Sequence, residues 1–119
     1  MLKLNVKTNS KLEFFIKLVT VLSLADPIKK LRPKERLLFA YLLYYNDKYK
    51  MLDMEERSRI VFDKKTRIDI CEAMRIDQQT FYNNKSQLKI KGLLKDDYLT
   101  KNFVSLYHKE NYEVTFIFD

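Results

Sequence analysis

The stretch "RIDICEAMRIDQQTFYNN", from Arg67 to Asn84, has the pattern of two short helices joined by a tight turn. Ile70 and Met74 recur at the spacing that places apolar side chains on one helix face. Asp77 stands at the start of the second segment, where a carboxylate caps the N–H groups that a helix start leaves unpaired. The expected helices cover residues 66–74 and 78–91.

The rest of the chain predicts three more helices and strands at both ends. Ser10, Pro33 and Asp53 stand where an N-cap or a first helical turn is expected. Gly92 is the only glycine and follows the last expected helix, where a left-handed residue closes it. Alternation of apolar and polar side chains at both ends of the chain is typical of half-buried strands. The expected helices are 10–24, 33–46 and a short one within 52–63, and the expected strands are 2–7, 103–107 and 112–118. We expect the first and last strands to pair in a small antiparallel sheet.

The composition is that of one globular domain. The chain has 119 residues, 46% hydrophobic and 33% charged, which suits one core and is too short for two. Cys71 is the only cysteine, so it has no disulfide partner in the chain and is expected to be a small core residue in a reducing cytosol. Lysines interrupt the early apolar runs, and the longest run, Leu37–Tyr45, is shorter than a membrane span. We therefore expect neither a signal peptide nor a membrane contact.

The sequence offers no pattern of enzyme chemistry. His108 and Cys71 are the only histidine and the only cysteine, which does not make a metal site of the usual composition. A single glycine cannot form a glycine-rich phosphate loop. The carboxylates are interleaved with Lys and Arg rather than paired for acid–base work. We predict a non-enzymatic protein with no catalytic residue, no metal, no cofactor and no small-molecule substrate.

The positive charge is concentrated in the first part of the chain. The net charge of +7 favours an acidic partner such as nucleic acid. Residues 1–50 hold 11 Lys/Arg against 4 Asp/Glu, whereas residues 51–119 hold 12 of each and are neutral. The two-helix stretch therefore lies in the neutral part. The predicted basic patch consists of Lys29, Lys30, Arg32, Lys34 and Arg36.

From Arg67 to Leu94 the chain resembles the helix-turn-helix superfamily. Cys71 takes the small-residue position of the first helix, Ile76 takes the apolar position of the turn, and "KGLL" closes the unit before the wing. The whole pattern is similar to small winged-helix proteins of tailed phages of Bacteroidetes, crAss-like phages included. The resemblance implies a winged helix-turn-helix, mainly α with a small antiparallel β-sheet. Its implied parts, within one domain over 1–119, are a basic strand and two apolar helices over 1–50, the helix-turn-helix over 66–92 and a β-hairpin wing over 97–119.

The resemblance also implies which side chains would contact DNA. In DNA-binding members, the N-terminal exposed face of the second helix meets base edges, where Gln and Asn suit adenine. The implied base-facing residues are Gln78, Gln79, Thr80, Tyr82 and Asn83, and the implied phosphate-facing residues are Arg75, Lys85, Lys89 and Lys91.

Three features depart from a DNA-binding member. Arg75 takes the turn position where the family prefers glycine, and a positive φ there costs roughly 1 kcal/mol. Lys85, beside Asn84, takes a position that usually buries an aliphatic side chain. The expected wing is acidic, which would forgo much of the counterion release that drives non-specific DNA binding. Its acidic residues are Asp96, Asp97, Glu110, Glu113 and Asp119, against Lys101 and Lys109.

The helices expected over 10–24 and 33–46 are apolar around most of their circumference. Such helices have to be buried on all sides, and a small domain rarely encloses two of them. One interpretation is that part of this surface contacts another chain, and the other is that one helix forms the centre of the core. The candidate interface residues are aromatic: Phe14, Phe15, Tyr41, Tyr44 and Tyr45.

Two functions fit these patterns. The favoured one is a non-enzymatic phage structural or assembly protein, part of a homo- or hetero-oligomer such as a head–tail connector ring. It would be assembled in the host cytoplasm and reside in the virion, with its basic half facing packaged DNA or an acidic partner. The alternative is a cytoplasmic, sequence-specific DNA-binding regulator. The neutral motif and the acidic wing favour the first function, and the helix-turn-helix spacing favours the second.

Overall fold

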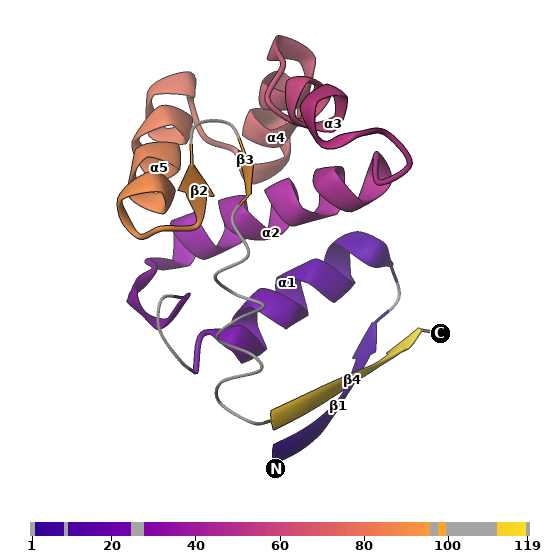
Figure 1. Ribbon diagram of the computed structural model, residues 1–119. Coiled ribbons are helices and arrows are strands. Elements are labelled where there is room, and N and C mark those ends of the chain that lie inside the picture. Colours follow the sequence, from indigo (N-terminus) through magenta and orange to yellow (C-terminus); the bar gives the residue numbers. More distant parts are fainter. Residues whose placement is uncertain (1, 9, 25–27, 96–97, 100–111, 119) are drawn as a thin grey trace.

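The computed structural model describes residues 2–8, 10–24, 28–95, 98–99 and 112–118, with side chains for 10–24 and 28–95. Within these residues the fold is mainly helical, which confirms that part of the expectation. The elements in chain order are β1 (Leu2–Thr8), α1 (Lys11–Leu22), the short 3-10 helix η1 (Ile28–Lys30), α2 (Pro33–Lys48), α3 (Met54–Val61), α4 (Lys64–Met74), α5 (Gln78–Ile90), β2 (Leu94–Lys95), β3 (Tyr98–Leu99) and β4 (Tyr112–Phe118) (Figure 1).

Short polar side chains fix where four of the helices begin. Ser10, Asp53 and Asp77 cap α1, α3 and α5 as predicted, each accepting the N–H three residues further on. Asp63 does the same for α4 by accepting from Thr66 at 2.8 Å, so α4 starts at Lys64 rather than at residue 66. The two apolar helices differ from prediction by two residues at their C-terminal ends, with α1 ending earlier and α2 later.

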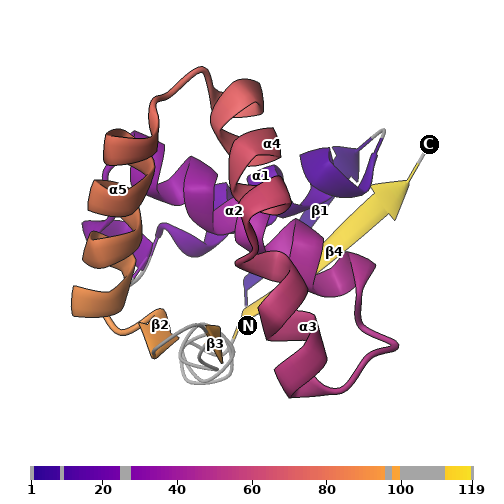
Figure 2. The ribbon, with the colours of Figure 1, turned by 90° about the horizontal axis from the view of Figure 1, so that it is seen from above.

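Helix α2 is the centre of the core. It contacts α1 on one side and α3, α4 and α5 on the other (Figures 1 and 2). Leu38, Phe39 and Leu42 are fully buried, and neighbouring α2 side chains are buried or half-buried. The apolar circumference of α2 is thus largely enclosed by the chain's own helices, as the second interpretation expected.

Helices α4 and α5 end in the same way, with a left-handed residue followed by an apolar one. Arg75 has φ 57° and Gly92 has φ 82°, as the sequence predicted for both positions. The N–H of Ile76 bonds to the carbonyl of Cys71 at 3.0 Å, and that of Leu93 bonds to the carbonyl of Leu88 at 2.9 Å. These six-to-one bonds are those of a Schellman cap, which turns the chain sharply after each helix.

The strands form two small pairings. β1 pairs with β4 in parallel, from Leu2 opposite Tyr112 to Thr8 opposite Phe118, so the predicted antiparallel orientation was wrong. The error has a simple cause, because apolar–polar alternation has the same period in either direction and carries no information on orientation. β2 and β3 pair antiparallel over two residues each. The predicted hairpin strand 103–107 and the acidic side chains of the wing lie outside the described residues.

Candidate nucleic-acid interface

Helix α5 buries one face and exposes the opposite one. Phe81 and Leu88 are buried in the core, and Met74 and Ile76 of the preceding helix and turn are only half-buried against it. The exposed side chains Gln79, Asn83, Ser86 and Ile90 follow one another at intervals of three or four residues. This spacing places them in a single row along the helix, the exposed row of α5.

Two amides of the exposed row are joined. Gln79 Nε2 donates to Asn83 Oδ1 at 3.0 Å, an i to i+4 bond along the helix surface. The bond uses one N–H of Gln79 and one lone pair of Asn83. The Asn83 amide nitrogen can still donate hydrogen bonds, and the Gln79 carbonyl oxygen can still accept them. The pair therefore presents both a donor and an acceptor from side chains whose rotamers restrain each other.

Along one flank of α5, a cation of α4 and one of α5 lie on aromatic rings. The Arg67 guanidinium lies 5.6 Å from the ring centroid of Tyr82, and Lys85 Nζ lies 4.7 Å from that of Phe62. Lys85 is half-buried, so its stem packs while its charge faces an aromatic ring, which explains how a lysine replaces an aliphatic residue there. Its neighbour Asn84 has a buried amide nitrogen with no hydrogen-bond partner in the described part of the chain.

The other flank lies against the start of α2. Lys91 Nζ donates to Glu35 Oε1 at 2.7 Å and to the carbonyl of Lys30 at 3.1 Å. Figure 1 shows α5 at one edge of the molecule with the start of α2 directly beneath it. Lys91 was predicted to face phosphate; in this structure its ammonium instead pairs with a carboxylate of the domain itself.

The predicted site residues separate by exposure. The exposed ones are Arg75, Gln78, Gln79, Tyr82, Asn83 and Lys89, and the half-buried ones are Thr80, Lys85 and Lys91. Thr80 is not part of the exposed row, because it hydrogen-bonds to Asp77 in the helix cap. These bonds, and more weakly the charge of Lys34, hold the pKa of Asp77 below its usual range, so the cap stays ionised.

The predicted basic patch is mostly exposed. Lys29, Lys30, Arg32 and Lys34 are exposed, whereas Arg36 is half-buried. Arg36 Nη2 donates to the carbonyl of Lys29 at 3.3 Å, and its Nε is buried with no hydrogen-bond partner among the described residues. Arg36 is therefore a half-buried residue that bonds to the backbone of the patch rather than an exposed cation.

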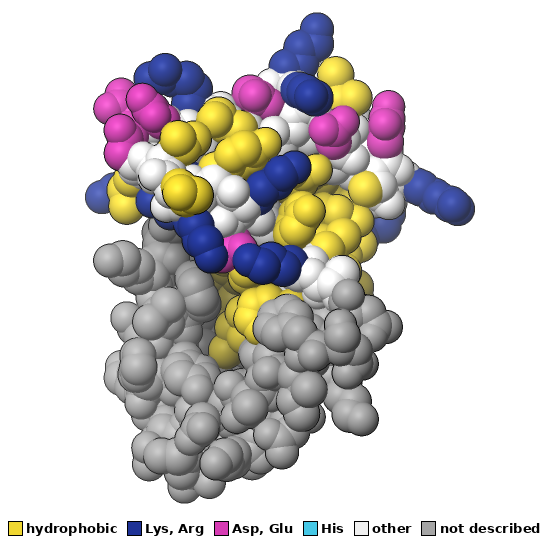
Figure 3. Space-filling view, turned by 90° about the vertical axis from the view of Figure 1, so that its right-hand side faces the viewer, with side chains coloured by type: hydrophobic (Ala, Val, Ile, Leu, Met, Phe, Trp, Pro, Cys, Tyr) yellow, Lys and Arg dark blue, Asp and Glu magenta, His cyan; other side chains and the backbone are white. Residues whose placement is uncertain are grey.

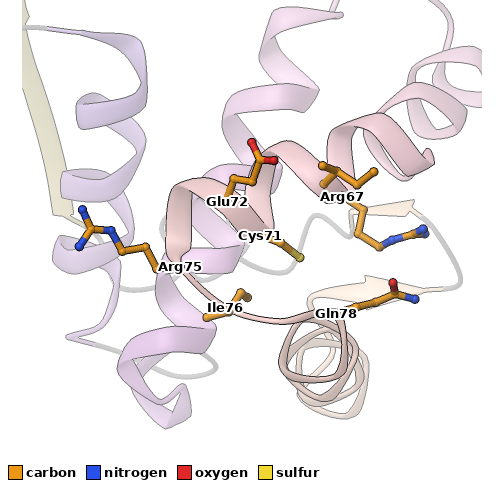
Figure 4. A pocket seen from close by; sticks show the side chains of 7 residues that line it. Arg67, Cys71, Glu72, Arg75, Ile76 and Gln78 are labelled. Atoms are coloured by element: carbon orange, nitrogen blue, oxygen red, sulfur yellow. The ribbon is translucent and has the colours of Figure 1, made fainter.

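A shallow hollow of about 320 Å³ lies between α4 and the start of α5 (Figure 4). Its lining includes Arg67, Cys71, Arg75 and Gln78, and the Cys71 sulfur points between the two helices. Cys71 is half-buried rather than a full core residue. Burial, with a smaller contribution from Asp77, raises the pKa of its thiol despite the opposing charge of Arg67, so the neutral thiol predominates at pH 7.

The predicted aromatic interface is not an exposed surface. Its five residues are Phe14, Phe15, Tyr41, Tyr44 and Tyr45, and each is half-buried. They pack partly on one another, with ring centroids 4.8 Å apart for the first two and 5.2 Å apart for the last two. Among the residues whose side chains the structure describes, the large exposed apolar ones lie elsewhere: Leu24, Met51, Met54, Ile68, Tyr82 and Ile90. Tyr82 was predicted to be exposed on the second helix. The exposure of the other five was not predicted, because single apolar residues carry no periodic signal.

The face seen in Figure 3 differs from the edge formed by α5 and the start of α2. Basic, acidic and apolar side chains alternate over its described part, with no large area of one sign. On this face, unlike around η1 and the start of α2, the exposed cations are interspersed with acidic and apolar side chains.

Comparison with protein-family models, curated proteins and solved structures finds no match for this chain. Among the described residues, no helix combines the length and apolarity needed to cross a membrane. In the same part of the chain, no three His, Cys, Asp or Glu side chains gather as metal ligands would.

Proposed function

We propose that this protein binds double-stranded DNA through α5, as a winged helix-turn-helix module that reads base edges with Gln79 and Asn83. The observation that carries the proposal is the joined amide pair, exposed on α5 between two cationic flanks. Adenine presents one acceptor and one donor in the major groove, and an amide side chain matches both. Gln78 is exposed at the start of the same helix and is the third candidate reader.

The dimensions of α5 suit this role. A helix with its side chains is about 10–12 Å across, and the major groove is about 12 Å wide. A helix lying in the groove has a row of phosphates on each side, so cations are needed on both flanks. Arg67 and Lys89 supply one flank, and the exposed lysines near the start of α2 supply the other. The β2–β3 pairing follows α5 directly, where a winged helix has its wing.

A second candidate is the structural or assembly role in a phage particle. Exposed apolar side chains favour it, since Ile90 is 74% exposed on the row that would face DNA, and Met51 is 95% exposed. Contact with another chain would cover them. This role predicts self-association or a stable hetero-complex, which sedimentation at tens of micromolar would detect, and it predicts DNA binding that is indifferent to sequence.

Selection from random duplexes tests the proposal. Repeated selection should enrich one site, and fluorescence anisotropy should then show at least about a thousandfold preference over a scrambled duplex. Asn83→Ala should abolish most of this preference while keeping non-specific binding. Ser86→Ala is the matched control, because Ser86 lies on the same exposed row without an amide. Failure to enrich any site would exclude the regulatory hypothesis and leave the assembly role.

A further inference from the structure

The stretch from η1 to the first turn of α2 exposes a run of cations on a buried base. Ile28 and Leu31 are buried at 0% and 3% exposure and anchor the segment in the core. The Leu31 N–H bonds to the Ile28 carbonyl at 3.0 Å, which closes the tight turn. Between and beyond these anchors the side chains point to solvent. Lys29, Lys30, Arg32 and Lys34 form this surface, which we call the basic shoulder.

The basic shoulder is fixed against α5. Lys91 bonds at once to Glu35 and to the carbonyl of Lys30, so the C-terminal end of α5 is fastened to the shoulder. At the other end of the helix, Lys34 is near enough to stabilise the ionised form of Asp77, the cap of α5. The shoulder therefore runs beside α5 rather than projecting away from it.

Three cations of the shoulder, Lys29, Arg32 and Lys34, form no ion pair with a neighbouring carboxylate in the described part of the chain. Glu35, the only acidic residue between positions 28 and 36, is 2% exposed and neutralised by Lys91. An exposed cluster of one sign, fixed to a buried base, attracts a polyanion and costs little ordering when it binds.

We infer that the basic shoulder is a second, sequence-independent contact for duplex DNA, gripping the phosphate row beside the groove that α5 enters. This inference rests on the proposed function and assigns affinity and sequence discrimination to two different surfaces. The shoulder supplies salt-dependent affinity, and the amide pair on α5 supplies discrimination between sequences. Residues 51–119, which include α5, have no net charge, and this alone would disfavour DNA binding. The shoulder removes that objection, because its cations come from residues 29–34.

The salt dependence of binding gives the size of the effect. Removing one lysine that neutralises a phosphate lowers the slope of log affinity against log salt by about 0.9. Replacing Lys29 and Lys34 together should therefore lower the slope by about 2. Each such phosphate pairing accounts for roughly a three- to fourfold decrease in affinity between 50 and 200 mM salt.

The shoulder variant is Lys29→Gln/Lys34→Gln. The control variant is Lys48→Gln/Lys50→Gln, which removes the same charge from two exposed lysines at the opposite end of α2. Anisotropy titrations at several salt concentrations would use the selected and the scrambled duplex. We expect the shoulder variant to lose slope on both duplexes with an unchanged preference between them, and the control variant to lose little. If the two variants have equal slopes and the unmodified protein keeps its sequence preference, the inference is wrong and the proposed function is not affected. Absence of that preference in the unmodified protein would instead remove the proposed function.

Discussion

Lys91 Nζ lies 2.7 Å from Glu35 Oε1, and this bond joins the end of α5 to the first turn of α2. Burial alone would raise the pKa of Glu35, but the hydrogen bonds from Lys91 and from the Arg32 N–H, with the nearby positive charge, hold it below its usual range. Glu35 is therefore ionised at neutral pH. The pair sets the position of α5 relative to the basic shoulder, and so the relative position of the two surfaces proposed to contact DNA.

Removing the lysine of this pair should destabilise the fold. Lys91→Met leaves a buried carboxylate without its cation, and we expect a decrease of about 2–3 kcal/mol in the free energy of unfolding. This is below the range for fully buried pairs, because the Lys91 side chain keeps 20% of its exposure. Urea denaturation measures the decrease. Lys89→Met, on the exposed part of the same helix, should cost less than about 0.5 kcal/mol. Similar decreases for the two variants would show that the ion pair does not stabilise the domain.

Stability should also depend on the ionisation of Glu35. A carboxyl group whose folded pKa lies below its unfolded value, near 4.5, contributes stability that is fully present above pH 4.5. That contribution is lost as the pH falls through the folded pKa. Denaturation of the unmodified protein and of Glu35→Gln between pH 7 and pH 3 should give two stability curves that converge toward low pH. Parallel curves over this range would contradict the assigned pKa shift.

The two left-handed caps offer a matched pair of substitutions. A non-glycine residue at positive φ costs about 1–2 kcal/mol, offset in part by the greater freedom of glycine in the unfolded chain. Arg75→Gly should therefore raise the free energy of unfolding by up to about 1 kcal/mol, and Gly92→Ala should lower it by about 1 kcal/mol. Thermal or urea unfolding of both variants checks the signs. A destabilising Arg75→Gly would mean that the arginine side chain contributes more than the backbone strain removes.

Local signals predicted most of the helices and their caps. Ser10, Asp53 and Asp77 each accept a hydrogen bond from the N–H three residues further on. The two residues with positive φ, Arg75 and Gly92, stand directly after the predicted helix ends. Such interactions are contained within one helical turn, so the residue pattern is enough to find them.

Long-range features could not be predicted in the same way. Lys91 and Glu35 are 56 positions apart, and nothing near either residue indicates the partner. The enclosure of α2 depends on how four other helices pack on it, and its apolar circumference alone does not tell a buried helix from one that contacts another chain. Tyr44 and Tyr45 are half-buried in the structure. The Gln79–Asn83 pair lies between these cases, because the exposure of both side chains was predicted from the helix-turn-helix resemblance, whereas the hydrogen bond between them was not.

The proposed contact between Asn83 and adenine decides whether α5 reads DNA. Each adenine of the selected site would be replaced in turn by 7-deazaadenine, which lacks the N7 acceptor, and binding would be measured with the unmodified protein and with Asn83→Ala. At one position we predict that either change alone weakens binding by about 1–3 kcal/mol and that both together weaken it no further. Additive effects at every adenine would show that Asn83 does not read adenine, and would contradict the proposal that this side chain gives α5 its sequence preference.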